Sequence, residues 1–225
     1  NIEVIILAAG EGTRMNSSTP KVLHQIGNQS LLDHVLTSAK KIKPSKIHLV
    51  ISEEISKIYS NKDKKINYII QKNRLGTADA ILQCLPHLKH SNNKILVLYG
   101  DVPLIDTSTI KKLLKIRKDE IKLLCFYKEE KNAFGKVILS SDGNISEVIE
   151  QKELSQKDHF FLCNAGLFCI LTKDLKKFLP KISNKNKKKE FYATDIFKIA
   201  TNNNINVGPV IVSENEVVSV NNKTD

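Results

Sequence analysis

Short apolar runs alternate with segments of helical spacing through the first half of the chain. Five of these runs lack polar alternation, as strands covered on both faces do, and they are EVIILAA, KIHLVIS, INYIIQ, KILVLY and IKLLCFY. Between them stand three stretches whose apolar residues recur with the period of a helix: SLLDHVLTSAKKI, with Ser30 placed to cap it, GTADAILQCLPHL and STIKKLLKI. This alternation predicts a mostly parallel sheet with helices on both faces.

The pattern changes in the second half of the chain. KVILSSDGNISEVIE indicates two short strands joined by a turn at Asp142-Gly143. CNAGLFCILTKDLKKFL then returns to a strand and a helix, and FYATDIFKIATNN and INVGPVIVSE predict a further helix and a late strand. We therefore expect residues 1–225 to form one α/β domain, a Rossmann-like, mostly parallel sheet flanked by helices, with a small β-rich portion on the substrate side.

Composition and charge exclude two classes of partner. The net charge of +11 comes mostly from lysines spread among Asn and Ile, not from an arginine-rich helix or a basic stripe with aromatic residues. Nucleic acid is therefore not expected as a partner, although the positive field could help to attract anionic substrates. No apolar run reaches the roughly 18 residues that a membrane helix needs. The first run is short and leads into glycines, which favours a buried strand in a cytoplasmic protein.

The four cysteines show no metal-binding or disulfide pattern. None stands in a CxxC pair, and no histidine cluster lies near them. Cys84, Cys125 and Cys169 lie in apolar segments, so we expect small core residues in a reducing compartment and no zinc site.

A glycine loop with two cations follows the first predicted strand. Gly10 and Gly12 allow a phosphate to approach the backbone, and Arg14 and Lys21 would supply charge. The loop fits neither common phosphate motif: Met15 replaces the third glycine of a dinucleotide fingerprint, and no G-x-x-x-x-G-K-[ST] string exists. A purely structural turn would explain the glycines but not the neighbouring cations. The loop therefore favours phosphate binding at the carboxyl end of the sheet.

A carboxylate follows a second predicted strand in YGDVPL. Asp101 should lie at the same edge of the sheet as the glycine loop, where it could bind Mg2+ together with substrate phosphate oxygens. The alternative is that Asp101 caps the turn or helix that follows.

The string LAAGEGTRM, followed by Pro20-Lys21, resembles the signature of the sugar-phosphate nucleotidyltransferases, whose general form is L-A-A-G-x-G-T-R-M and then P-K. Further motifs stand in the order found in the bacterial N-acetylglucosamine-1-phosphate uridyltransferases of this family, and the similarity covers essentially the whole chain: QKNRLGTADA, YGDVPL, EVIEQKE, CNAG, EFYATDI and VNNK. The resemblance implies the nucleotide-diphospho-sugar transferase fold.

The resemblance also implies roles for individual residues. Arg14 and Lys21 would be catalytic, neutralising the triphosphate and its pyrophosphate leaving group, and Asp101 with Asn221 would hold the cofactor Mg2+. The nucleotide would be held by Leu7, Ala8, Ala9, Gly10, Gln71, Gly76, Thr77, Tyr99 and Gly100, and among these Gln71, Gly76 and Thr77 would face uracil. The sugar phosphate would be held by Gly135, Glu150, Asn164 and Thr194.

The reaction implied by the resemblance joins UTP and N-acetylglucosamine 1-phosphate to give UDP-N-acetylglucosamine, a precursor of peptidoglycan and lipopolysaccharide, and pyrophosphate. A sugar-phosphate oxygen would attack the α-phosphate in line, assisted by Mg2+. Three alternatives stay open: transfer to another sugar 1-phosphate, use of another nucleoside triphosphate, and a non-catalytic nucleotide-binding homologue. A nicotinamide dehydrogenase is disfavoured by Met15.

Side-chain chemistry is compatible with three of these roles. The amide of Gln71 could match the N–H and the carbonyl groups of uracil, Glu150 could accept from sugar hydroxyls, and Asn164 could pair with an N-acetyl amide. Each also has a simpler explanation: Gln71 could be a polar residue at a strand end, Glu150 a solvated charge and Asn164 a turn former.

The chain departs from the family pattern on the sugar side. Ala165 stands where threonine is common, Phe134-Gly135-Lys136 replaces a more typical Tyr-Gly-Arg, and Gln151 often has histidine as its counterpart. These changes make the amino-sugar preference less secure than nucleotide transfer. The chain also lacks the hexapeptide repeats of a left-handed β-helix, so we expect the acetyltransferase domain to be absent, and a trimer only if the full-length protein contains that domain.

Overall fold

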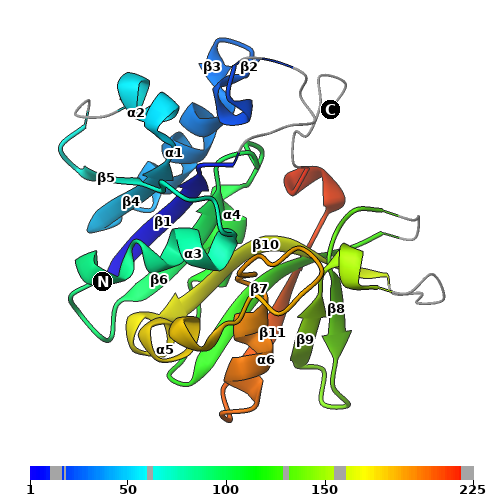
Figure 1. Cartoon of the computed structure of the whole chain (residues 1–225). Helices are drawn as coiled ribbons and strands as arrows, with labels where there is room; N and C mark the ends of the chain where they lie inside the picture. Colours follow the sequence, from blue (N-terminus) through cyan, green and yellow to red (C-terminus); the bar gives the residue numbers. More distant parts are fainter. Residues whose placement is uncertain (11–16, 18, 60–62, 129–131, 155–160, 219–225) are drawn as a thin grey trace.

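A nine-stranded sheet forms the centre of the molecule (Figure 1). The computed structural model describes residues 1–10, 17, 19–59, 63–128, 132–154 and 161–218. In this part of the chain the strand order is β11-β7-β10-β6-β1-β4-β5, with β8 paired to β10 and β9 to β8. The strands are β1 (Ile2–Ala8), β4 (Lys46–Ile51), β5 (Ile66–Ile70), β6 (Lys94–Tyr99), β7 (Glu120–Tyr127), β8 (Lys136–Leu139), β9 (Ile145–Ile149), β10 (Leu162–Leu171) and β11 (Asn206–Val212).

Most of the strands run in one direction. β6, β1, β4 and β5 are mutually parallel, and β11 is parallel to β7. β10 runs against both β6 and β7, so its first residues lie at the edge where β6 and β7 end. The prediction of a mostly parallel sheet is confirmed, and the reversed β10 brings a segment from the second half of the chain to the carboxyl edge.

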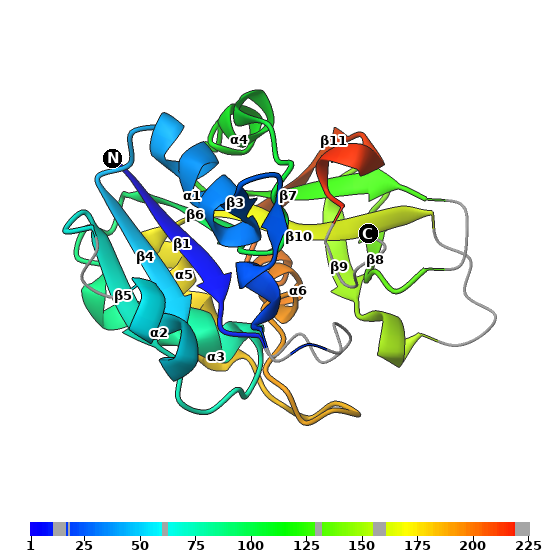
Figure 2. The same cartoon turned by 90° about the horizontal axis from the view of Figure 1, so that it is seen from above.

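Apolar side chains cover both faces of this sheet. In β1, Ile5 and Leu7 join one core cluster, whereas Val4, Ile6 and Ala8 join the other. Three helices contribute to the first cluster: α3 (Thr77–Leu82), α5 (Thr172–Phe178) and α6 (Asp195–Thr201). Three contribute to the second: α1 (Leu31–Lys41), α2 (Glu53–Tyr59) and α4 (Thr107–Leu113). Figure 2 shows α1 and α4 together on one side of the sheet.

Local signals fix several element boundaries. Ser30 caps α1 as predicted: its side chain accepts from the Asp33 backbone N–H at 3.1 Å, and the Asp33 carboxylate accepts from the Ser30 backbone N–H in return. Such a cap stabilises a helix by about 1 kcal/mol. The predicted turn at Asp142-Gly143 joins β8 and β9, and Gly143 has the positive φ of +79° that glycine tolerates.

Other elements are shorter than their sequence patterns, or were not predicted. The helix predicted from GTADAILQCLPHL divides into α3 and a 3-10 turn, Leu85–His87, where Pro86 lacks a backbone N–H. α2 was not predicted, because Ile55 is its one buried residue. Small elements outside the main sheet are the 3-10 turns Lys21–Leu23, Gln151–Glu153, Leu179–Lys181 and Glu214–Glu216 and the pair β2 (Gln25–Ile26) and β3 (Gln29–Ser30).

The cysteines behave as core residues. All four are buried and unpaired, which confirms the expectation for Cys84, Cys125 and Cys169. Burial raises the pKa of the Cys169 thiol to about 12, so this group stays protonated at neutral pH. Among the described residues, no helix is both long enough and apolar enough to cross a membrane.

Candidate functional site

The candidate site lies at the carboxyl ends of β1 and β6. Because β4 and β6 flank β1, the crossover direction reverses beside β1, and ligands gather at such a point in α/β sheets. Gly100 donates its backbone N–H to Leu7 O at 2.9 Å. A Cβ on Gly100 would stand 3.0 Å from Ala8 Cβ and 3.3 Å from Val22 Cγ1, so glycine permits this close approach. The two segments that follow these strands, including buried Ala9 and exposed Gly10, are therefore held together.

An ion pair joins the two segments. Lys21, the first residue of the 3-10 turn after Pro20, pairs through Nζ with Asp101 Oδ2, and these side chains are only 11% and 20% exposed. The helix that follows Asp101, α4, is capped by a different carboxylate: Asp106 Oδ1 accepts from the Ser108 backbone N–H at 2.6 Å. Asp101 is thus not the cap of α4, and it stays at the carboxyl edge beside a cation.

Two predicted site residues, Arg14 and Asn221, lie outside the described residues, as does most of the glycine loop (residues 11–16). In the described part of the chain, no three His, Cys, Asp or Glu side chains gather in a metal-binding arrangement. Asp101 nevertheless offers a hard carboxylate oxygen of the type that Mg2+ prefers.

A second group of predicted residues, Gln71, Gly76 and Thr77, links β5 to α3. Gln71 is buried, and its Nε2 donates to Asp79 Oδ2 at 2.6 Å and to Gly76 O at 3.3 Å. Gly76 has a φ of +122°, and a Cβ there would stand 2.5 Å from Phe191 O, so this position requires glycine. Thr77 Oγ1 accepts from the Ala193 backbone N–H at 2.9 Å. Residues 191–193 therefore fix the start of α3.

The predicted sugar-binding residues form a third group: Gly135 directly precedes β8, Glu150 directly follows β9, Asn164 lies in β10 and Thr194 directly precedes α6. Thr194 Oγ1 donates to Glu150 Oε1 at 2.7 Å, and the Asn164 backbone N–H donates to Gly135 O at 2.9 Å. Glu150 Oε2 is the oxygen that faces Gly135, at 3.6 Å from the place a Cβ would take. Burial raises the pKa of the Glu150 carboxyl, and neighbouring carboxylates such as Asp195 add to the rise although the Thr194 hydroxyl opposes it.

Tyr99 connects the three groups. Its ring lies against Gly166, where a Cβ would stand 2.8 Å from Tyr99 Cε2 and where φ is +85°. Burial raises the pKa of the Tyr99 hydroxyl, and the carboxylates of Glu150 and Asp101 add to this rise although a hydrogen bond with Thr77 opposes it. The structure therefore brings all the predicted site residues that it describes to one edge of the sheet, with Tyr99 between the Lys21–Asp101 pair and the sugar-side group.

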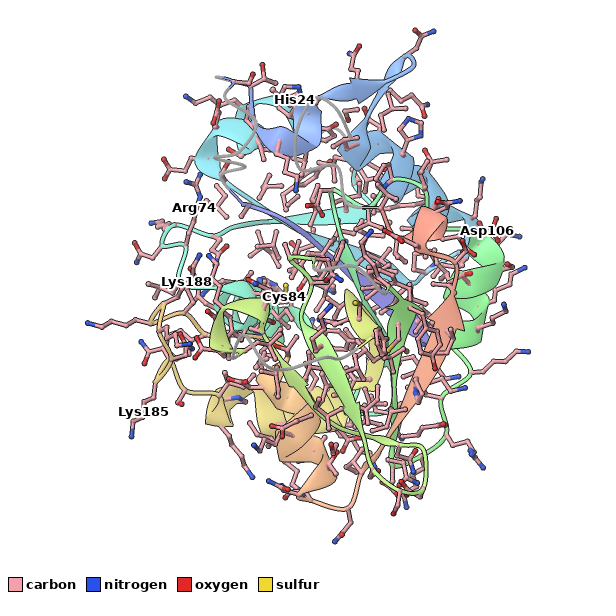
Figure 3. The ribbon with its side chains drawn as sticks, turned by 90° about the vertical axis from the view of Figure 1, so that its right-hand side faces the viewer. His24, Arg74, Cys84, Asp106, Lys185 and Lys188 are labelled. Atoms are coloured by element: carbon pink, nitrogen blue, oxygen red, sulfur yellow. The ribbon has the colours of Figure 1, made fainter. Side chains whose placement is uncertain are left out.

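Sequence reasoning missed three contributors to this edge: Asp79, Gly166 and Phe191. Each stands inside a quoted motif, but its contacts depend on long-range packing. Phe191 N donates to Leu75 O at 2.8 Å and Phe191 O accepts from Ala78 N at 2.9 Å, which holds the lysine-rich segment 183–190 beside the Gln71 group. In Figure 3 Arg74, Lys185 and Lys188 lie on the same side of the molecule, and Asp106 lies on the other.

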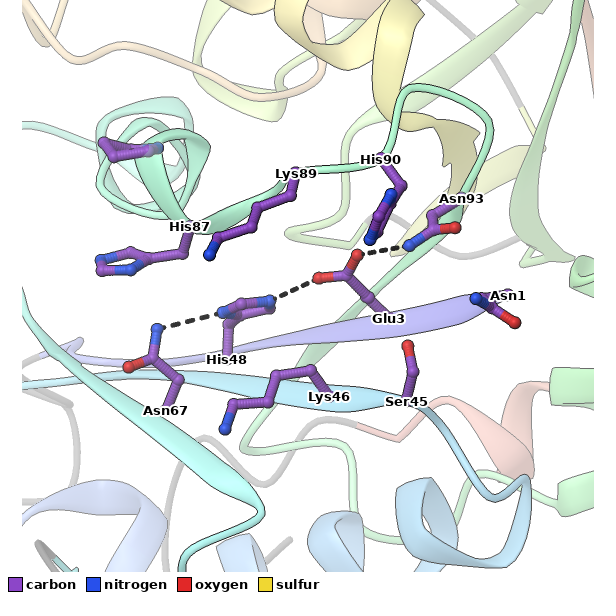
Figure 4. A pocket seen from close by; sticks show the side chains of 11 residues that line it. Asn1, Glu3, Ser45, Lys46, His48, Asn67, His87, Lys89, His90 and Asn93 are labelled. Atoms are coloured by element: carbon purple, nitrogen blue, oxygen red, sulfur yellow. Dashed lines mark hydrogen bonds and ion pairs between the residues drawn. The ribbon is translucent and has the colours of Figure 1, made fainter.

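A separate cavity of about 430 Å³ lies at the opposite, amino-terminal edge of the sheet (Figure 4). Glu3, near the start of β1, accepts from Asn93 Nδ2 at 2.6 Å and bonds His48 Nε2 at 2.8 Å. Asn67 Nδ2 lies 3.2 Å from His48 Nδ1. None of the predicted site residues lines this cavity.

Comparison with known proteins identifies the family. The model of the MobA-like NTP transferase domain matches residues 4–193. A relative from Buchnera aphidicola subsp. Schizaphis graminum, called "Bifunctional protein GlmU", is 41% identical over 226 residues, which cover 99% of this chain and 49% of the relative. A protein of the same name from Francisella philomiragia is 34% identical over 226 residues, which cover 99% of this chain and 50% of the relative. The chain thus spans about half the length of these relatives.

Two solved structures share the fold. A putative glucose-1-phosphate thymidylyltransferase from Bacillus anthracis has a TM-score of 0.74 at 17% identity, over 95% of this chain and 87% of that one. The inositol-1-phosphate CTP transferase from T. maritima has a TM-score of 0.72 at 19% identity, over 94% and 85%. The family match and the shared architecture agree: the chain belongs to the MobA-like NTP transferase domains and is a nucleotidyltransferase.

Proposed function

We propose that the chain transfers a uridylyl group from UTP to N-acetylglucosamine 1-phosphate and releases pyrophosphate. The observation that carries this proposal is the partly buried Lys21–Asp101 pair at the carboxyl ends of β1 and β6, with the Gln71 group and the Glu150 group at the same edge. The motif order and the relatives called "Bifunctional protein GlmU" support the choice of substrates.

On the nucleotide side, the backbone of Leu7, Ala8, Ala9 and Gly10 approaches the phosphates, since this segment ends β1 and leads into the glycine loop. Lys21 and Arg14 neutralise the triphosphate and the departing pyrophosphate. The base occupies the space beside Gln71, Gly76 and Thr77, and Tyr99 and Gly100 form the wall between base and sugar.

On the sugar side, Glu150 and Asn164 face the acceptor. Glu150 Oε2 accepts from sugar hydroxyls, while Thr194 holds the other oxygen of the same carboxylate. Asn164 Oδ1 accepts from the Gly166 backbone N–H at 2.8 Å, which leaves the amide nitrogen to pair with an N-acetyl carbonyl. Gly135 lets the sugar approach the backbone of β8.

Nucleotidyltransferases of this family generally use a divalent metal, and we assign Mg2+ binding to Asp101 and Asn221. Asp101 fits this role because it offers a carboxylate oxygen at the ligand edge of the sheet. When bound, Mg2+ supplies positive charge that offsets the repulsion between the two phosphate-bearing substrates. Lys21, already paired with Asp101, holds this carboxylate in place.

The chemistry requires no covalent enzyme intermediate, since the attacking sugar phosphate is already an anion. Its oxygen forms a bond to the α-phosphorus of UTP, the bond from that phosphorus to the bridging oxygen breaks, and pyrophosphate carries away the electron pair. Lys21 and Arg14 act on the charge that grows on this leaving group. Catalysis is therefore positioning and charge stabilisation. The four unpaired cysteines support a cytoplasmic, reducing setting.

A pyrophosphate-release assay tests the proposal. We expect release from UTP only when N-acetylglucosamine 1-phosphate and Mg2+ are both present, with lower rates for glucose 1-phosphate and for CTP or dTTP. Faster release with glucose 1-phosphate would replace the sugar assignment. UTP binding without any release would instead favour a non-catalytic nucleotide-binding protein.

A further inference from the structure

The amide of Gln71 is held by two hydrogen-bond acceptors. Its nitrogen lies 2.6 Å from Asp79 Oδ2 and 3.3 Å from Gly76 O. A carboxylate and a backbone carbonyl can only accept, so the –NH2 end of the amide must face them and the carbonyl end must face away. The orientation of Gln71 is therefore fixed by the chemistry of its neighbours.

Asp79 is itself held in place. Its second oxygen, Oδ1, accepts from Gln83 Nε2 at 3.2 Å, one turn further along the helical segment. Asp79 stands in the first turn of α3, whose start is fixed by Gly76 and Phe191. The carboxylate of Asp79, the acceptor that faces Gln71, is thus bonded through both of its oxygens, to Gln71 and to Gln83.

Both N–H groups of Gln71 are committed to the protein, so Oε1 remains for a ligand. Among the described residues, Gln71 forms its two side-chain hydrogen bonds through Nε2, and it lines a cavity of about 370 Å³ together with Ser52, Glu53 and Arg74. The sequence suggested that the Gln71 amide could both donate to and accept from a base. With its nitrogen bound to Asp79 and Gly76, the amide does not have a donor left for the base. It can only accept.

We propose that Asp79 is a positioning residue for base selection: it makes Gln71 present a carbonyl oxygen, which selects a pyrimidine with a ring N–H. Uracil carries a donor at N3 that this oxygen can accept, whereas N3 of cytosine is an acceptor and would face Oε1 with no hydrogen between them. Such a mismatch reduces affinity roughly ten- to a hundredfold. This inference rests on the proposed function, since it places a pyrimidine nucleotide beside Gln71.

Direct binding of UTP and CTP tests the inference. Dissociation constants are measured by calorimetry for the wild-type chain and for the variants Asp79→Leu, Asp79→Ala and Asp79→Asn, and kcat/KM is measured for the same nucleotides. Leu and Ala remove the acceptor, whereas Asn keeps one acceptor oxygen but loses the charge. Asp33→Leu is the matched control, because Asp33 is also the third residue of a helix, α1, and accepts hydrogen bonds from Ser30 and Tyr59 instead of from Gln71.

We expect the wild type to favour UTP over CTP. In Asp79→Leu and Asp79→Ala, which leave the weaker contact with Gly76 O as the acceptor for Gln71 Nε2, this ratio should fall roughly tenfold, mainly through weaker UTP binding. Asp79→Asn should keep the ratio within about twofold, as should Asp33→Leu. A wild-type ratio retained by Asp79→Ala or Asp79→Leu would overturn the inference, and so would equal binding of UTP and CTP by the wild type. If UTP binds selectively but no pyrophosphate is released, the proposed transfer fails while the assignment of Asp79 stands on the binding ratios.

Discussion

The two edges of the sheet both carry buried polar side chains, but these side chains are satisfied in different ways. At the amino edge, Glu3, His48, Asn67 and Asn93 bond to one another in an unbroken series. Asn93 O also accepts from the Thr172 backbone N–H at 2.9 Å, which extends the series to α5. At the carboxyl edge the polar groups form separate small sets, namely Lys21–Asp101, Gln71–Asp79–Gln83 and Thr194–Glu150.

Two of these groups leave a side-chain oxygen without a hydrogen bond from the described residues. Asp79 occupies the nitrogen of Gln71 but not Oε1, and Thr194 occupies Glu150 Oε1 but not Oε2. The closed series joins the first residues of β1 to β4, β5 and the segment before β6, which is a structural task. At the carboxyl edge, by contrast, Gln71 Oε1 and Glu150 Oε2 can accept hydrogen bonds from a ligand. The two edges therefore differ in the arrangement of their polar groups more than in the types of those groups.

The largest effect is expected at the carboxyl edge, for Lys21→Ala. Removing one cation aimed at the growing charge of the leaving group should lower kcat by about a hundred- to a thousandfold. The KM for UTP should change less, because that charge is greatest in the transition state. Steady-state kinetics with both substrates measures the split. Lys40→Ala, which removes the exposed pair with Asp63, is the control and should leave kcat unchanged. An unchanged kcat with only a raised KM would contradict the role of Lys21.

The second effect should fall on stability alone, for Glu3→Ala at the amino edge. This change leaves Asn93 Nδ2 and His48 Nε2 buried without their acceptor, which costs about 2–3 kcal/mol of the free energy of unfolding. Urea denaturation measures it, and Glu3→Gln, which keeps one acceptor oxygen, should lose less. The kcat of the folded variant should equal that of the wild type. A normal stability with a lowered kcat would show that the amino edge serves the reaction.

The carboxyl edge could be located from the sequence, because apolar runs mark strands and the residues just beyond them must lie at strand ends. This logic placed the glycine loop and Asp101 at one edge, whereas the Lys21–Asp101 ion pair and the polar series at the amino edge were not predicted. The direction of β10 could not be read, since CNAGLFCIL has the same pattern in either direction, yet the reversal brings Asn164 to the carboxyl edge. Asp79 gave no signal either, because an acidic residue in the first turn of a helix is common for electrostatic reasons alone. Its pairing with Gln71 depends on how α3 packs.

A third, smaller effect is expected for the Thr194–Glu150 pair, which we propose to bind the sugar phosphate. Thr194→Val keeps the shape of the side chain but removes the hydroxyl that donates to Glu150 Oε1. We expect the KM for N-acetylglucosamine 1-phosphate to rise about tenfold, because Glu150 is then less well oriented and its ionised form is less stabilised. The KM for UTP should stay within about twofold. Thr194→Ser retains the hydroxyl and should behave like the wild type, whereas an equal change in both KM values would mean that Thr194 supports the fold of the whole edge.

The smallest effect is the pH dependence of stability at the amino edge. Burial lowers the pKa of His48 from its ordinary value, although the hydrogen bond with Glu3 opposes this, so the ring takes up a proton less readily in the folded chain than in the unfolded one. The unfolded chain binds a proton near pH 6.5, and it therefore holds more protons than the folded chain as the pH falls below that value. Stability from this group is complete above pH 6.5 and is lost on acidification. Between pH 7.5 and 5.5 the wild type should lose more of its free energy of unfolding than His48→Gln, whose amide can replace the bonds to Glu3 and Asn67 without titrating. Urea denaturation at the two pH values measures this difference, and substitution of the partly exposed His34, His34→Gln, serves as the control. Equal losses of the free energy of unfolding in the wild type and in His48→Gln would mean that protonation of His48 does not destabilise the folded chain. The amino edge would then differ from the carboxyl edge without any contribution from His48.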